Sequence, residues 1–252
     1  MSGNSRKPTG GKNYGSIPHL PNSRLGPGDY SCDPGMAKIA TEKTRDEKDR
    51  VVVQEKLDGT NVGVAKVNGE ILALQRAGYL ATTSPHKMHH YFAEWVERNR
   101  SRFDGLLKEG ERVCGEWLIQ AHGTRYKLNH EPFVAFDLMA GKKRVNWSVF
   151  DLRTREYNFV TPYVIGVGGA MSVEEALKAL GEFGKHGALD PVEGAMWRVE
   201  RVKKGADPNA ESAWEVDFLV KYVRPNKKDG RYLPEVSGEE PVWNCDAEEF
   251  MG

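Results

Sequence analysis

A lysine at the end of a predicted buried strand is the residue of this chain best placed for covalent chemistry. Residues 51–55 read Val-Val-Val-Gln-Glu, a β-branched run typical of a buried strand, and Lys56 follows directly. Gly59 comes three residues later, and a glycine lets a ligand approach the backbone closely. A lysine so placed is a candidate nucleophile in a nucleotide pocket. Taken alone, the same residues equally fit a strand that ends in a hairpin turn.

Charged side chains interrupt other apolar runs of the sequence. Glu116, Asp137 and Glu193 each lie within, or at the head of, such a run. A buried charge is costly unless it is paired or faces a polar site. Two cations, Arg76 and Lys221, also lie on predicted strands. We therefore expect these five side chains and Lys56 to meet around a charged ligand.

The pattern of apolar residues and turn signals predicts a mixed α+β domain. Asn68-Gly69 is a type I′ hairpin signal between two strands. Residues 87–100 carry apolar side chains at helical spacing, and residues 172–183 begin with a Ser-x-x-Glu capping box. Residues 36–49 are compatible with a charged surface helix. The predicted strands are 51–57, 62–67, 70–76, 112–119, 133–139, 192–199 and 214–223.

The charge balance argues against a strongly basic nucleic-acid binder. Lys and Arg together number 36, as do Asp and Glu. The charge is uneven, because residues 1–30 carry four basic residues and one acidic residue, whereas 235–252 carry six acidic residues. The middle of the chain therefore has 32 basic against 29 acidic residues, which fits an anionic ligand. The hydrophobic content of 39% is ordinary for a soluble globular protein.

The three cysteines, Cys32, Cys114 and Cys245, are too few and too scattered for a disulfide framework or a zinc site. Reduced thiols indicate the cytosol, so we expect a cytoplasmic protein. No apolar run approaches the length of a membrane span, and the N-terminus lacks the apolar core of a signal peptide. We therefore expect no membrane partner.

Composition divides the chain into three parts. Residues 1–13 are small and polar and are predicted to form a disordered N-terminal tail. Residues 14–224 hold every predicted strand and form the expected domain. Its first part, residues 14–29, mixes apolar and turn residues and is predicted to be an ordered loop pinned onto the domain. Residues 225–252 are expected to form a polar, acidic C-terminal tail.

These motifs, taken in order, resemble those of the covalent nucleotidyltransferase superfamily of ATP-dependent ligases and capping enzymes. More narrowly, residues 14–224 resemble the ATP-dependent RNA ligase family typified by the second RNA ligase of phage T4. Asn61 is typical of RNA ligases, because DNA ligases and capping enzymes usually have arginine there. The matching segments are Lys-Leu-Asp-Gly-Thr-Asn (56–61), Gln-Arg-Ala-Gly (75–78), Gly-Glu-Trp-Leu (115–118), Phe-Val-Ala-Phe-Asp (133–137), Glu-Gly-Ala-Met-Trp-Arg (193–198) and Leu-Val-Lys-Tyr (219–222).

The resemblance implies a nucleotidyltransferase (adenylation) domain built on antiparallel sheets with flanking helices, which binds ATP between two sheets. We expect no C-terminal OB-fold of the kind that DNA ligases carry, because few residues follow Pro225. Lys56 would form a covalent lysyl-AMP, pass AMP to an RNA 5′-phosphate, and seal that end to a 3′-hydroxyl. Mg²⁺ or Mn²⁺ would be held by Glu193 and Asp137. The implied ATP-binding residues are Glu55 at the adenine edge, Leu57, Asn61, Arg76, Glu116 at the ribose, Phe136 stacked on adenine, and Lys221.

The last motif departs from the family pattern, which usually has two lysines spaced by one residue. Leu219 stands where the partner of Lys221 is expected, or Val223 does if Lys221 is the first of the two. Arg198 and Arg224 are candidate replacements. RNA binding would depend on the catalytic domain, the N-terminal segment or an accessory protein.

Other interpretations stay open. A DNA nick ligase or an RNA guanylyltransferase would share most of the motifs. A non-catalytic nucleotide- or RNA-binding module would keep the same fold. Leu219 favours this interpretation, and the intact Lys56 disfavours it. His122 and Arg125 fit either a substrate contact or a surface loop. A solvated or RNA-facing helix end, rather than a metal site, is expected for His86, His89 and His90.

Overall fold

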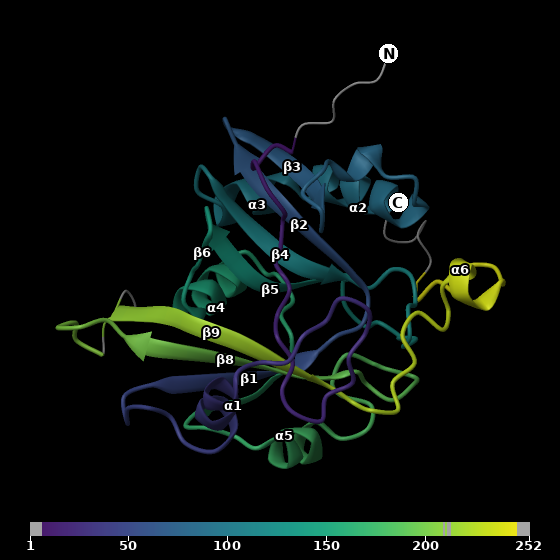
Figure 1. The fold of residues 1–252 in the computed structure, drawn as a ribbon. Helices are drawn as coiled ribbons and strands as arrows, with labels where there is room; N and C mark the ends of the chain where they lie inside the picture. Colours follow the sequence, from purple (N-terminus) through teal and green to yellow (C-terminus); the bar gives the residue numbers. More distant parts are fainter. Residues whose placement is uncertain (1–6, 209, 211–212, 246–252) are drawn as a thin grey trace.

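Two antiparallel sheets lie one above the other in the computed structural model, which describes residues 7–208, 210 and 213–245 (Figure 1). Sheet A has the order β7 (Val164–Gly168), β1 (Arg50–Lys56), β8 (Gly194–Val202) and β9 (Trp214–Val223). Sheet B has the order β3 (Glu70–Gln75), β2 (Thr60–Val67), β4 (Glu111–Trp117), β5 (Phe133–Ala140) and β6 (Lys143–Arg144). All of these strand pairs are antiparallel. The α+β class expected from the sequence is confirmed.

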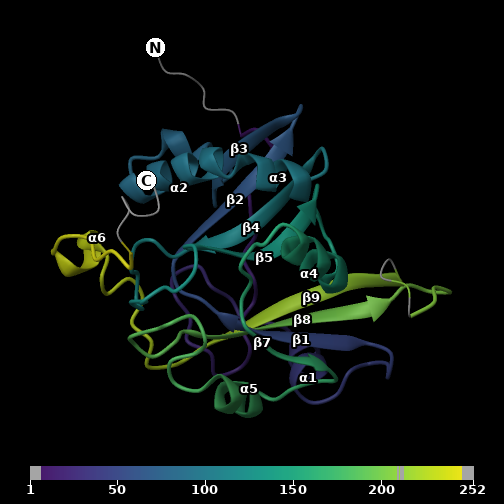
Figure 2. The ribbon, with the colours of Figure 1, turned by 180° about the vertical axis from the view of Figure 1, so that it is seen from behind.

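Helices cover the outer faces of the two sheets (Figures 1 and 2). Helices α1 (Pro34–Thr41) and α5 (Val173–Leu180) pack on sheet A, and α2 (Lys87–Arg98) and α3 (Arg100–Leu106) pack on sheet B. The remaining helical elements are η1 (Ala81–Thr83), α4 (Trp147–Glu156) and α6 (Pro234–Ser237). No helix in the described part of the chain is long and apolar enough to cross a membrane.

Aromatic side chains fill the core between sheet B and its helices. Phe92 and Trp95 of α2 pack against Trp117 and Phe133 of the sheet, with ring centroids 5.3 to 5.8 Å apart. The amphipathic spacing over 87–100 predicted this face, and the helix is interrupted only at Asn99. The predicted capping box is also present at the start of α5. Helix α4 was not predicted, because its sequence has too few apolar residues at helical spacing.

The turn 57–59 connects the two sheets, because β1 ends in sheet A and β2 begins in sheet B. Strand alternation then decides which side chains enter the space between the sheets. On β2, Val62 and Val64 face the helices, so Asn61 and Gly63 face the opposite side. The candidate lysine therefore lies at the junction of both sheets.

The N-terminal segment crosses the face of sheet B that the helices leave open (Figure 1). Asn13 is fully buried, and its side chain occupies the space that a Cβ at Gly63 would fill. Its backbone N–H donates to the Arg76 carbonyl, and its own carbonyl accepts a hydrogen bond from Arg112. The prediction of disorder is therefore wrong for residues 7–13, because small polar side chains of this segment pack where glycines of the sheet leave room. Residues 1–6 lie outside the described residues.

The segment after β9 also packs against the domain instead of leaving it. Backbone hydrogen bonds join Tyr232 to His122 and Val242 to Ala121, and the Trp243 ring meets Tyr91 edge-on at 5.6 Å. The polar C-terminal tail expected over 225–252 is thus ordered as far as residue 245, because its backbone pairs with the loop after β4. Residues 246–252 lie outside the described residues.

Candidate active site

A cavity of about 850 Å³ opens between the two sheets around Lys56. This volume is within the range of small-molecule sites. Its walls come from the ends of β1, β2, β8 and β9, from β4 and β5, and from the N-terminal segment. Of the residues expected to bind ATP or metal, those that line it are Glu55, Lys56, Leu57, Asn61, Arg76, Glu116, Phe136, Glu193 and Lys221.

Lys56 ends β1 and forms an ion pair with Glu193. The Lys56 Nζ lies 2.6 Å from Glu193 Oε2, because Lys56 pairs with Gly194 across the β1–β8 ladder. Burial alone would lower the pKa of Lys56, but the carboxylates of Glu193, Glu116 and Asp58 raise it above its usual value. Lys56 is therefore an ammonium in this state and becomes nucleophilic only when its proton leaves.

Glu116 forms the opposite side of this charge cluster. It lies on β4 beside Asn61 of β2, and its Oε1 accepts a hydrogen bond from the Gly59 N–H at 3.0 Å. Burial raises the pKa of Glu116 to about 7, against the opposing effect of Lys56. A Cβ at Gly59 would lie 2.7 Å from the Trp117 carbonyl oxygen, so a glycine is needed for the turn to pack on β4.

Asn61, Arg76 and Phe136 line the part of the cavity that sheet B forms. The buried Asn61 Oδ1 has no hydrogen-bond partner, so it can accept a hydrogen bond from a ligand. Arg76 is exposed at the end of β3, where its guanidinium can reach an anionic group. Phe136 is supported edge-on by Tyr14, with ring centroids 5.0 Å apart. Asn61, Arg76 and Phe136, which are all expected to contact the nucleotide, thus lie on one wall of the cavity.

Lys221 lies on the opposite wall and contacts the N-terminal segment. Its Nζ is 3.3 Å from Asp29 Oδ1, and the other oxygen of Asp29 is 3.1 Å from His19 Nε2. Burial and then the nearby charge of Lys56 lower the pKa of Lys221 from its usual value. His19 and Asp29 were not identified from the sequence, although residues 14–29 were predicted to pack on the domain. No motif marks them, because they meet Lys221 only through folding.

Glu55 does not point its carboxylate into the cavity. Alternation along β1 sends it to the face opposite Lys56, where Oε2 accepts the Lys185 N–H at 3.0 Å and Oε1 lies against Gly184. Burial raises the pKa of Glu55 to about 7. The expectation that this side chain reads the adenine edge is therefore wrong, and only the backbone at Glu55 remains available to a base. Leu57 packs in the apolar cluster beneath the turn.

Asp137 is fully buried and does not line the cavity. Its oxygens accept hydrogen bonds from Arg198 at 2.8 Å, Arg144 at 2.9 Å, Tyr14 at 2.8 Å and the Leu138 N–H at 3.1 Å. These partners offset its charge and occupy its lone pairs, so a cation has no oxygen left to bind. The expectation of Asp137 as a metal ligand is wrong, and its unusual place in an apolar strand is explained by this buried network.

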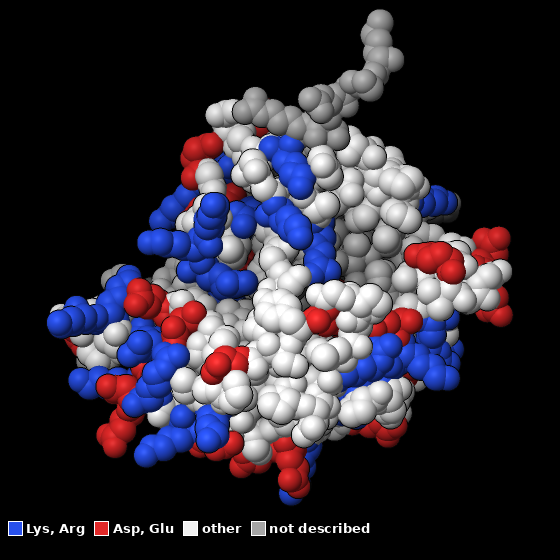
Figure 3. Space-filling view, in the orientation of Figure 1, with Lys and Arg blue, Asp and Glu red and all other residues white. Residues whose placement is uncertain are grey.

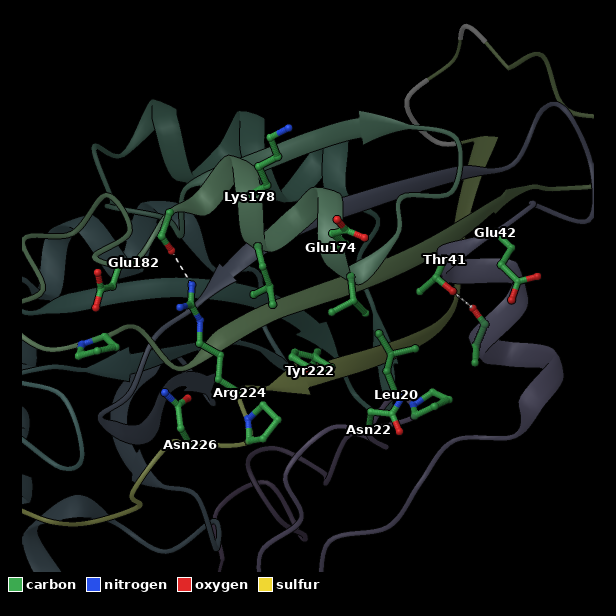
Figure 4. Close-up of a pocket in the computed structure, with 17 residues that line it drawn as sticks. Leu20, Asn22, Thr41, Glu42, Glu174, Lys178, Glu182, Tyr222, Arg224 and Asn226 are labelled. Carbon is green, nitrogen blue, oxygen red and sulfur yellow. Dashed lines mark hydrogen bonds between the residues drawn. The ribbon is translucent and has the colours of Figure 1, made fainter.

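The two candidate replacements for the missing lysine are held by other groups. Arg198 lines the cavity, but its guanidinium is paired with Asp137 and Glu200. Arg224 turns into a second cavity, of about 1060 Å³, where its guanidinium donates to the Gly181 carbonyl (Figure 4). Leu219 is buried in an apolar cluster with Tyr14, Ile17, Cys114 and Met139.

The carboxylates beside Lys56 fit a divalent cation only together with a phosphate ligand. Among the described residues, no group of three or more His, Cys, Asp or Glu side chains is arranged to hold a metal. Mg²⁺ is usually bound through one or two carboxylates plus substrate phosphates. Glu193, with Glu116 nearby, meets that requirement.

The histidines at the start of α2 and on the loop after β4 differ in their surroundings. His86, His89 and His122 line the cavity, and His122 Nε2 lies 3.0 Å from the Thr60 hydroxyl. His90 instead binds the Ser84 carbonyl at 2.7 Å. Arg125 is held by Asp190 and lies over the Tyr232 ring. Of the two loop residues considered for a substrate contact, His122 lies at the cavity, and Arg125 is paired with Asp190.

Comparison with known proteins identifies similar sequences and folds. A model of the RNA ligase family matches residues 49–223. The uncharacterized protein MJ0414 of Methanocaldococcus jannaschii is 26% identical over 114 residues, which are 45% of this chain and 25% of that protein. A solved archaeal ATP-dependent RNA ligase (form 2) is 20% identical, with a TM-score of 0.47 over 83% of this chain and 48% of that one.

The Naegleria gruberi RNA ligase, in a lysine-to-alanine mutant with ATP and Mn, is 12% identical with a TM-score of 0.51. The match covers 82% of this chain and 59% of that one, and it shows a shared fold. The chain thus covers less than two thirds of the length of each of these proteins. Because the family model matches well over half of the chain, this protein belongs to the RNA ligase family.

Proposed function

We propose that this protein is an ATP-dependent RNA ligase that works through a covalent adenylate on Lys56. The observation that carries the proposal is the Lys56–Glu193 ion pair, 2.6 Å long, inside a nucleotide-sized cavity of an RNA ligase family member. An amine and a carboxylate at this distance can exchange a proton, which a nucleophilic lysine requires. ATP is the expected co-substrate, and the related solved enzymes are named as ATP-dependent or hold ATP.

The first step joins the Lys56 nitrogen to the α-phosphorus of ATP. The N–P bond forms, the bond to the bridging oxygen breaks, and pyrophosphate leaves. The proton lost by Lys56 passes through Glu193 to water, which leaves the Glu193 carboxylate charged. Lys221, on the facing wall, places a positive charge where phosphate charge develops. Asn61 and Glu116 offer acceptors to the sugar hydroxyls, and Phe136 offers a ring to the base.

The later steps return Lys56 to its starting state. An oxygen of the RNA 5′-phosphate attacks the adenylate, the N–P bond breaks, and AMP moves to the RNA end. A 3′-hydroxyl then attacks the activated 5′-phosphate, a phosphodiester forms, and AMP leaves. A divalent cation, Mg²⁺ or Mn²⁺, would offset phosphate charge when bound. Glu193 is the residue that would hold it, whereas the buried Asp137 has no role there.

Basic side chains beside the cavity support RNA as the substrate. Figure 3 shows Lys and Arg gathered over sheet B and the N-terminal segment. The Arg76 side chain is exposed at the cavity, and its backbone carbonyl accepts a hydrogen bond from the Asn13 N–H of the N-terminal segment. Lys12, in the same segment, is exposed. Such a surface attracts phosphates independently of base sequence. An accessory protein that assists RNA binding stays a prediction.

Incubation with α-labelled ATP and magnesium, followed by denaturing electrophoresis, tests the proposal. The wild-type protein should become labelled, and labelling by GTP should be weaker. Lys56→Arg should keep the charge beside Glu193 but form no adduct, since a guanidinium stays protonated. Lys178→Arg, on the exposed face of α5, is the matched control and should label normally. An adduct that persists in folded Lys56→Arg, or a preference for GTP, would contradict this function.

A further inference from the structure

A second buried lysine holds the turn that carries Lys56. Lys227 lies in the segment between β9 and α6, and its side chain is only 4% exposed. Its Nζ is 2.7 Å from Asp58 Oδ2 and also donates to the Thr124 hydroxyl. Lys227 is not among the described residues that line the cavity, whereas Asp58 is. Lys227 therefore contacts the site indirectly, through Asp58.

Asp58 receives hydrogen bonds from two separate parts of the chain. Its Oδ2 also accepts the Gly123 N–H at 2.9 Å, and its own backbone N–H donates to the Tyr126 hydroxyl at 3.1 Å. A Cβ at Gly123 would lie 2.9 Å from Asp58 Oδ2 and 3.1 Å from Lys227 Cε. The glycine therefore allows the loop, the C-terminal segment and the Lys56 turn to meet at one point.

A buried ion pair is costly to desolvate, and breaking it on one side leaves an unpaired charge. Such a pair is therefore weak evidence for stability but can fix one conformation. Here it ties the C-terminal segment to the second residue after Lys56. The segment is itself anchored, because Tyr232 N–H donates to the His122 carbonyl at 2.8 Å.

We propose that Lys227 is a positioning residue that sets the geometry of the Lys56 nucleophile through its ion pair with Asp58. The C-terminal segment is then part of the catalytic unit. In-line attack needs reacting atoms placed to within a few tenths of an ångström, and a 1 Å displacement can cost about a hundredfold in rate. This role rests on the proposed adenylyl transfer.

Lys227→Met should slow adenylylation at saturating ATP by about tenfold to a hundredfold, with a much smaller change in the KM for ATP. Lys227→Arg should restore much of the rate, because an arginine can pair with Asp58. In the background of Asp58→Asn, the Lys227→Met change should cost far less than in the wild type, because the pair is already broken. Lys228→Met, at the exposed neighbour, is the matched control and should behave as wild type.

Hydrogen exchange separates this inference from the proposed function. In Lys227→Met, the amides of residues 57–61 and 123 should exchange faster than in wild type, while the core of α2 stays protected. If the wild-type protein forms no adduct, the proposed function fails, yet the exchange result still decides whether Lys227 holds the turn. Unchanged exchange at 57–61, or equal adenylylation rates in folded Lys227→Met and wild type, would overturn the inference.

Discussion

The Lys56 ammonium and the Glu193 carboxylate lie 2.6 Å apart although 137 positions separate them in the sequence. The β1–β8 ladder causes this contact, because it pairs Lys56 with Gly194, the neighbour of Glu193. In the proposed mechanism, Glu193 serves as the counter-ion of Lys56 in the absence of ligand, and its carboxylate can bind a cation once the proton of Lys56 has passed to water. The same carboxylate is thus linked to two functions of the site.

Glu193→Gln should lose adenylylation far more than stability. The amide keeps a hydrogen bond to Lys56 but cannot supply the negative charge that a divalent cation requires. We expect a large fall in the rate of labelling and a higher magnesium concentration for half-maximal labelling, with a melting temperature within a few degrees of wild type. A chelator should abolish labelling of the wild type. A large drop in melting temperature, with normal activity per folded molecule, would instead mean that Glu193 is structural.

Asp137→Asn should show the opposite pattern. Removing the carboxylate leaves Arg198 and Arg144 without their shared partner in the core, and breaking a buried ion pair typically costs about 3–5 kcal/mol. Urea unfolding should show this loss, while the magnesium dependence of labelling per folded molecule stays unchanged. Asp217→Asn, at a partly exposed pair with Arg45, is the control and should cost less than about 1 kcal/mol. A changed magnesium dependence would restore Asp137 as a metal ligand.

Glu55 should make the folded state less stable as the pH rises. Burial raises its pKa from 4.5 to about 7, so between these values the folded chain holds a proton that the unfolded chain releases. The free energy of unfolding therefore falls with rising pH across this window. Glu55→Gln removes this contribution. The free energy of unfolding of the variant, relative to that of wild type, should therefore rise by about 2–3 kcal/mol between pH 5 and pH 8.

Urea unfolding of Glu55→Gln and wild type at both pH values measures this difference. Glu240→Gln, at an exposed position, serves as the control and should follow the wild-type pH dependence. Parallel pH dependence of Glu55→Gln and wild type would mean that the Glu55 carboxyl ionises normally in the folded protein.

Arg76→Ala should weaken RNA sealing without affecting the fold. The side chain is exposed at the cavity, so the free energy of unfolding should change by less than about 0.5 kcal/mol. If Arg76 contacts one phosphate, the slope of log binding constant against log salt should become shallower by about 0.7 to 0.9. Fluorescence anisotropy with a 5′-phosphorylated RNA at several salt concentrations measures this slope.

Arg100→Ala is the matched control for Arg76→Ala. This arginine is also exposed but lies at the start of α3 between Glu70 and Glu97, away from the cavity. Its removal should leave RNA affinity and salt dependence unchanged. Equal losses in both variants would show that Arg76 contributes only general positive charge.

Local pattern in the sequence determined the class of fold and the central residue. β-Branched runs and the Asn68-Gly69 turn predicted most of the strands, because side-chain alternation is a property of each strand alone. The run that ends at Lys56 and the acids Glu116 and Glu193 within apolar stretches indicated the site. A charge in an apolar run is costly unless its side chain is paired or faces a polar site, and these side chains face the cavity.

Only the tertiary structure decided what each charge faces. Asp137 and Glu193 look alike in the sequence, yet one lies beside Arg198 in the core and the other beside Lys56 in the cavity. Glu55 precedes Lys56, but the pleat of β1 sends the two side chains to opposite faces. Pairing between strands and packing of distant segments set these surroundings. No local pattern contains them, because the partners of a buried charge are chosen by contacts across the chain.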